Sequence, residues 1–139
     1  MKTQEEHVSK MIAEFSNAFI IKEKRERFNS TFFNQKKRKK FLAVFNIHNI
    51  ILPETLIKIL PSNQTYEYIL NRLKSLSNSK NCYVISDDSI LDDKIAEIEE
   101  TFEKIYYGNA NSLIILDPSK SAYIQLEEKN YKYFLISKH

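Results

Sequence analysis

The sequence predicts an α+β fold: a helical N-terminal half packed on a four-stranded mixed sheet with β-α-β-β-β order in the C-terminal half. Two observations predict this class. Apolar residues recur at helical spacing up to residue 80, and short apolar runs typical of strands follow. The length of 139 residues is that of one domain. We therefore expect a single domain over 1–139, with a helical part at 1–80 and a β-α-β-β-β part at 81–139.

Four segments of the N-terminal half have the spacing of amphipathic helices. The apolar stripe of the first is Val8, Ile12, Phe15 and Phe19. A second helix is expected over residues 35–46, and a short third one between Pro53 and Pro61. The fourth follows a cap at Ser62 or Asn63. Its buried face is predicted to be Tyr66, Ile69, Leu70, Leu73 and Leu76.

After residue 81 the spacing changes to that of strands. Residues 82–86 are apolar and rich in β-formers, and Ser89 with Asp92 resembles a capping box that opens a helix. That helix ends at Gly108, the single glycine of the chain. Because glycine adopts the left-handed conformation at little cost, we expect Gly108 to have it.

Three further segments predict three more strands: an apolar run at 113–116, an alternating segment at 121–127 and the closing segment at 131–137. The helix between the first two strands predicts a crossover connection, so these two strands should be parallel. Short turns join the last three strands, which should form an antiparallel meander.

Composition excludes several classes of protein. No apolar run approaches the length needed to cross a bilayer, and the polar N-terminus lacks a signal-peptide pattern. Cys82 is the single cysteine, so neither an internal disulfide nor a cysteine-based zinc site can form. We expect a cytoplasmic protein with no membrane partner and no cofactor.

Charge is divided unevenly along the chain. Residues 1–80 carry a net charge of +8, and residues 81–139 carry −5. Nine cations and two acids lie within residues 22–40. The cations are Lys22, Lys24, Arg25, Arg27, Lys36, Lys37, Arg38, Lys39 and Lys40. This density of positive charge attracts phosphate backbones, so it is a candidate surface for RNA, DNA or an acidic partner.

Aromatic residues accompany these cations, and Phe32, Phe33 and Phe41 could stack on bases if exposed. No known nucleic-acid-binding motif accompanies the basic run. A solvated helix surface, or a contact with the acidic half of the same chain, is therefore the alternative interpretation.

The late part of the chain is rich in tyrosine, a residue that protein interfaces favour. Tyr123, Tyr131 and Tyr133 are accordingly a candidate protein interface, and packing within strands is the alternative. Because the two halves carry opposite charge, a homodimer is a further expectation.

Residues suited to catalysis are few. Asp87, Asp88, Asp92 and Asp93 follow the first predicted strand, where carboxylates could hold Mg²⁺. The alternative is that they stabilise a helix N-terminus and a turn. The chain has no nucleophile motif, phosphate loop or dinucleotide fingerprint, so we predict no enzymatic activity. A metal-dependent hydrolase is the enzyme class that these aspartates leave open.

Three stretches, at 37–42, 82–86 and 118–123, together resemble a family of short bacterial proteins with no assigned activity. The resemblance covers residues 35–137 and departs at Ser119, where the family has glycine, and around 109–112. It implies a bacterial cytosolic protein with a β-α-β-β-β C-terminal half, and it supplies no activity, cofactor or substrate for this chain.

Two function classes follow from the sequence. The first is a non-catalytic protein-interaction module, such as an immunity or regulatory protein, with an unidentified protein as its partner. The alternative is a nucleic-acid-binding protein that uses residues 22–40.

Overall fold

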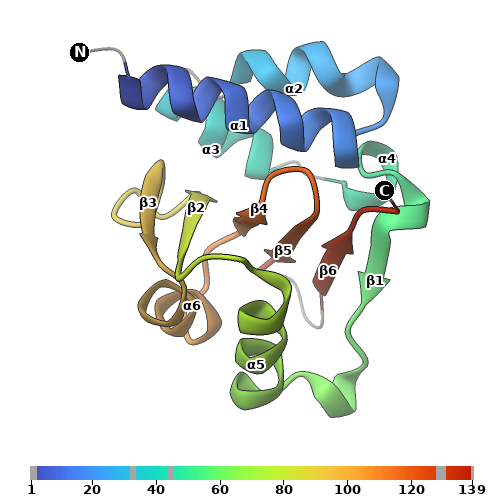
Figure 1. The fold of residues 1–139 in the computed structure, drawn as a ribbon, viewed down its shortest axis with the longest axis vertical. Coiled ribbons are helices and arrows are strands. Elements are labelled where there is room, and N and C mark those ends of the chain that lie inside the picture. Colours follow the sequence, from blue (N-terminus) through green and yellow to red (C-terminus); the bar gives the residue numbers. More distant parts are fainter. Residues whose placement is uncertain (1–2, 32–33, 44–45, 128–130, 139) are drawn as a thin grey trace.

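The structure is a computed structural model that describes residues 3–31, 34–43, 46–127 and 131–138. In these residues, six strands form one antiparallel sheet in the order β1-β6-β5-β4-β2-β3, and helices cover both faces (Figure 1). The strands are β1 (Leu56–Lys58), β2 (Asn81–Ser86), β3 (Lys94–Glu97), β4 (Ser112–Asp117), β5 (Ser121–Gln125) and β6 (Lys132–Ile136).

Helices α1 to α4 lie on one face of the sheet, and α5 and α6 lie on the other (Figure 1). The α-helices are α1 (Thr3–Phe19), α2 (Arg25–Thr31), α3 (Gln35–Ala43), α4 (Ile47–Ile50), α5 (Tyr66–Leu76) and α6 (Ile98–Tyr106). Three short 3-10 helices are η1 (Lys22–Lys24), η2 (Pro53–Thr55) and η3 (Pro61–Asn63). No helix in the described ranges has the length and apolar character that crossing a membrane requires.

The predicted four-stranded mixed sheet is wrong, although the α+β class holds. The prediction lacks β1 and β3, and β2 and β4 are antiparallel instead of parallel. β3 forms a hairpin with β2 and returns the chain to the start of β2, where Glu97 lies opposite Asn81. The chain therefore enters α6 at the end of the sheet where β2 begins. β4 starts at the opposite end, with Ser112 paired to Ser86, and runs antiparallel to β2. The last three strands form the predicted antiparallel meander.

Two local predictions in the C-terminal half are also wrong. Residues 89–93 form a turn instead of a helix start, and Asp93 there has a positive φ of 59°. Gly108 does not have a positive φ. A Cβ at Gly108 would lie 2.8 Å from the backbone oxygen of Lys104, so close packing on α6 explains the glycine.

The predicted helices of the N-terminal half are partly confirmed. α1, α3 and α5 exist, but the N-cap of α5 is Thr65, because η3 occupies residues 61–63. Thr65 Oγ1 accepts a hydrogen bond from the Tyr68 N–H at 3.3 Å. The expected helix after Pro53 is only η2, and β1 follows it at the edge of the sheet.

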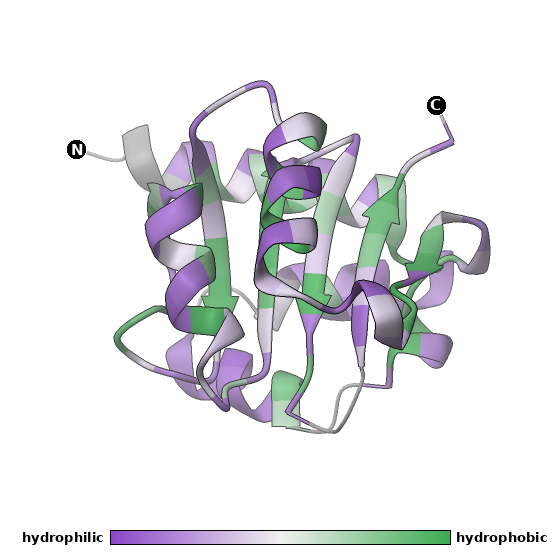
Figure 2. Cartoon of the chain, turned by 90° about the horizontal axis from the view of Figure 1, so that it is seen from below, coloured by the Kyte–Doolittle hydropathy of each residue, from purple (hydrophilic) through white to green (hydrophobic). Residues whose placement is uncertain are grey.

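The sheet separates two hydrophobic cores because its side chains alternate between faces. Tyr83 and Ile85 of β2 pack with the helices α1 to α4, whereas Val84 packs with α5 and α6. Phe15 of α1 and Phe102 of α6 are fully buried on their respective sides. Figure 2 shows hydrophobic residues concentrated in the strands and hydrophilic residues along the outer side of α5.

Candidate functional site

A cleft of about 460 Å³ lies between α2, α3 and α4. Four cations line it, and no described lining residue is acidic. They are Lys24, Arg27, Lys37 and Lys40. None of the four forms an ion pair with another described residue. Among the described residues, the cleft therefore concentrates positive charge that no carboxylate pairs with.

Helix geometry explains why these cations converge. Lys37 and Lys40 are three residues apart on α3, so both point to the same side of the helix. Arg27 comes from α2, which packs against α3, and Lys24 comes from η1 just before α2. The Asn34 side chain accepts a hydrogen bond from the Lys37 N–H at 3.2 Å, which caps the start of α3.

The floor of the cleft is apolar. Phe28 is buried, and Phe41 is half-buried beside it with the ring centroids 5.5 Å apart in an edge-to-face arrangement. Phe28 also contacts Phe15 of α1, so this floor continues into the core. Ile50 of α4 completes it. Part of the half-buried Phe41 side chain lines the cleft.

Two amide side chains line the α4 side of the cleft, Asn46 and Asn49. The Oδ1 atom of Asn46 accepts a hydrogen bond from the His48 N–H at 3.1 Å, which caps α4. Its amide nitrogen is the group left to donate to a ligand. Asn49 is exposed. These asparagines lie outside the basic run, and the sequence contains no signal that assigns them to it.

The other five predicted cations are not in the cleft. Lys22, Lys36 and Lys39 are exposed and do not line it. Arg25 Nε donates a hydrogen bond to the Ile20 backbone oxygen at 2.9 Å, just after the end of α1. The structure thus divides the basic run by location, because only some of its side chains line the cleft.

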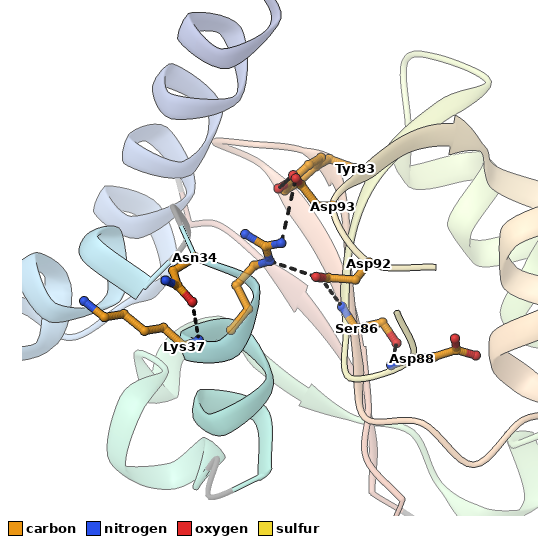
Figure 3. Close-up of polar contacts among 8 residues, drawn as sticks. Asn34, Lys37, Tyr83, Ser86, Asp88, Asp92 and Asp93 are labelled. Atoms are coloured by element: carbon orange, nitrogen blue, oxygen red, sulfur yellow. Dashed lines mark hydrogen bonds and ion pairs between the residues drawn. The ribbon is translucent and has the colours of Figure 1, made fainter. Parts of the chain in front are cut away.

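Arg38 faces the interior and has only 6% of its surface exposed. Its Nε atom donates to Asp92 Oδ2 at 2.9 Å, and one of its terminal nitrogens lies 3.8 Å from Asp93 Oδ2. The Ser86 N–H donates to Asp92 Oδ1 at 3.0 Å (Figure 3). Figure 3 also shows the Lys37 side chain extending away from Asp92 and Asp93. Arg38 therefore anchors α3 to the turn between β2 and β3.

Tyr83 extends this network to the partly exposed Asp93, since its hydroxyl donates to Asp93 Oδ1 at 2.6 Å. Burial, followed by this hydrogen bond to Asp93, raises the pKa of Tyr83 well above its ordinary value. The phenol stays protonated and continues to donate. A buried arginine, two aspartates and a tyrosine thus hold the helix that carries Lys37 and Lys40.

Comparisons with known proteins return no match. No family model matches the chain, and no curated protein or solved structure is similar to it. The resemblance to a family of short bacterial proteins stays a prediction.

The four aspartates considered for metal binding have other partners. Asp87 Oδ2 accepts from the Asn111 amide at 2.9 Å, and Asp88 Oδ1 accepts from the Ile90 N–H at 2.9 Å. Asp92 and Asp93 belong to the Arg38 network described above. Among the described side chains, no three of the metal-ligating types gather closely enough to hold an ion together.

The three tyrosines of the predicted protein interface do not share a surface. Tyr123 and Tyr133 are buried in the two cores, and Tyr131 is 41% exposed. The Tyr123 hydroxyl donates to Gln125 Oε1 at 2.7 Å inside the core. Phe32 and Phe33, predicted for stacking, lie outside the described residues, and Phe41 lies in the cleft.

Proposed function

We propose that the protein binds nucleic acid through the cleft between α2, α3 and α4. The observation that carries the proposal is the convergence of four cations from separate elements, Lys24 and Arg27 on one side and Lys37 and Lys40 on the other, with no ion pair to any residue that the structure describes. Neutralising phosphates with such cations releases condensed counterions, which favours binding without any base-specific contact.

The charges of the acidic half do not explain this cleft. Among the described residues, the ion pairs between the basic segment and the acidic half all involve Arg38, which contacts Asp92 and Asp93. The cleft cations have no such partner in the described part of the chain, so we propose that an external anion compensates them. A merely solvated helix surface does not account for Lys37 and Lys40 lining one cleft together with Arg27 of α2.

The protein-interaction module stays a prediction with weaker support, because Tyr123 and Tyr133 are inaccessible to a partner. The proposed role is binding without catalysis, and we propose the cytoplasm as its location. A homodimer also stays a prediction. Light scattering at low and high salt tests it, and a monomer in both conditions would remove it.

The anisotropy of a labelled RNA or DNA oligonucleotide, titrated with protein at several salt concentrations, tests the proposal. The double variant Lys37→Gln/Lys40→Gln removes two cleft cations. Since each phosphate contact contributes about one unit, the slope of log affinity against log salt should become shallower by about two units.

The matched control is Lys36→Gln/Lys39→Gln, which removes the same charge from the same helix at exposed positions outside the cleft. Its slope should change by less than half as much. If the salt slope became shallower by the same amount in both double variants, binding would depend on diffuse charge and the cleft would be rejected as the site. Absence of binding by the wild-type protein at low salt would reject the function.

A further inference from the structure

We infer that the cleft accepts one unpaired base, so that the protein prefers single-stranded nucleic acid to a duplex. This inference rests on the proposed function and goes beyond it. It is carried by the composition of the cleft behind its cations: an aromatic and aliphatic floor together with two amide side chains.

A phosphate-binding surface has no need of an apolar floor. Phosphates are bound by cations and N–H groups at open, hydrated surfaces. Here the cations surround a concavity whose floor includes Phe41 and Ile50. Burying these side chains against another apolar group is favourable, because it removes apolar surface from water. A charged, hydrated phosphate offers no apolar surface for this. A base does, because every base has a flat π-face that stacks on an aromatic ring.

The size of the cleft limits what enters it. Its volume of about 460 Å³ is within the range of small-molecule sites, which hold one nucleotide-sized group. It lies between helices that are tied to the core by Phe28 and to the sheet by Arg38. A duplex keeps its bases stacked and paired, so it can offer this cleft only its backbone.

The polar groups of the cleft fit a base better than a hydrocarbon. Asn46 has its amide nitrogen left to donate, and Asn49 is exposed at the same cleft. An amide offers both a donor and an acceptor, which is the pattern that base edges display. Lys37 and Lys40 could then contact the phosphates on either side of the inserted base.

The test compares a labelled single strand of about 12 nucleotides, long enough to cover one binding site, with a duplex of the same sequence at one low salt concentration. The single strand should bind at least about tenfold more tightly, because stacking of one base on an aromatic side chain supplies a factor of this size. Phe41→Leu keeps an apolar side chain but removes the π-face. It should lower single-strand affinity about tenfold and leave duplex affinity and the salt slope unchanged.

Asn49→Ala provides a second variant that does not disturb the core, since Asn49 is exposed. It should lower single-strand affinity by about threefold, the effect of one lost hydrogen bond, and leave duplex affinity unchanged. Thermal melting of each variant shows whether it is folded. If Phe41→Leu is unfolded, the Asn49→Ala result decides.

Equal affinity for single strand and duplex would overturn the inference. The inference would also be overturned if the affinity of a folded Phe41→Leu variant, or of the Asn49→Ala variant, fell equally for the single strand and the duplex. In either case the salt slopes of the lysine variants would still stand as a separate measurement of the proposed function. Failure of both probes to bind at low salt would reject the proposed function itself.

Discussion

Arg38 of α3 and Asp92 of the β2–β3 turn form a buried ion pair, with Nε of the arginine 2.9 Å from Oδ2 of the aspartate. Their side chains are only 7% and 3% exposed. α3 carries four further adjacent cations and no acidic residue in its first turn, so its own charges oppose helix formation. The ion pair compensates one of these charges and fixes the helix on the sheet.

Asp92→Asn should therefore destabilise the protein strongly. The substitution leaves the buried Arg38 guanidinium without its closest counter-charge, and breaking a buried pair from one side costs about 3 kcal/mol or more. The free energy of unfolding from urea denaturation measures the effect. Glu99→Gln is the control, because it breaks the exposed pair between Lys74 and Glu99 and should cost little. Similar losses in the two variants would contradict the structural role of Asp92.

The second prediction concerns alkaline pH. Burial raises the pKa of the Cys82 thiol from 9.0 to about 12. Because the pKa is higher in the folded state, the contribution to stability is complete below pH 9 and is lost as the pH rises toward about 12. The stability of the wild-type protein should fall from pH 9 upward, with a limiting slope of about 1.4 kcal/mol per pH unit from this thiol.

Cys82→Ala isolates this contribution, since it removes the titrating group whatever its effect on absolute stability. Between pH 9 and pH 10, below the ordinary pKa of the tyrosines, the variant should show a flatter dependence of unfolding free energy on pH. Urea denaturation across this range measures it. Parallel curves for wild type and variant would show that the thiol does not contribute.

A third prediction tests the reason for the glycine after α6. Gly108→Ala places a Cβ 2.8 Å from the Lys104 backbone oxygen, and backbone there must shift. We expect a loss of about 1–3 kcal/mol in unfolding free energy, the usual cost of overpacking. The neighbouring Asn109→Ala is the control, because Asn109 is exposed. A Gly108→Ala protein more stable than wild type would instead indicate that reduced freedom of the unfolded chain outweighs the contact.

The fourth prediction concerns a buried amide between two elements. Gln125 of β5 accepts from the Tyr123 hydroxyl at 2.7 Å and donates to the Ile105 backbone oxygen at 2.9 Å. Gln125→Leu leaves the Tyr123 hydroxyl without its partner in the core, whereas the Ile105 oxygen keeps a hydrogen bond from the Gly108 N–H at 3.2 Å. We expect a loss of about 1–3 kcal/mol, the cost of one unsatisfied buried group. Tyr123→Phe removes the hydroxyl, so the double variant should lose less than the sum of the single losses. Additive losses in thermal or urea unfolding would argue against the bond.

Part of the fold is readable from periodicity. The stripe from Val8 to Phe19 and the set from Ile69 to Leu73 each repeat at helical spacing, and both lie on helices. The strands β4 to β6 are apolar runs between turn signals, which is why the meander is predictable. β1 and β3 are only three and four residues long and mostly exposed, so they are too short to show the alternation that identifies a strand.

The candidate site is less readable. The basic run is obvious in the sequence. However, the adjacent cations Lys37 and Arg38 lie in different places, because Arg38 is buried against Asp92 and Lys37 lines the cleft. On a helix, adjacent residues point about 100° apart, so one side chain reaches the interior and the next reaches the cleft. Asn46 and Asn49 join the cleft through a separate short helix, which no spacing within the basic run encodes.

Periodicity and composition predict the α+β class, the main helices, the C-terminal meander and the concentration of positive charge within residues 22–40. Tertiary structure decided the strand order, the partner of Arg38 and which cations share a cleft. The difference arises because periodicity and charge density depend only on residues that are close together in the sequence. The pairing of Arg38 with Asp92 and the closing of the cleft instead depend on contacts between segments far apart in the sequence.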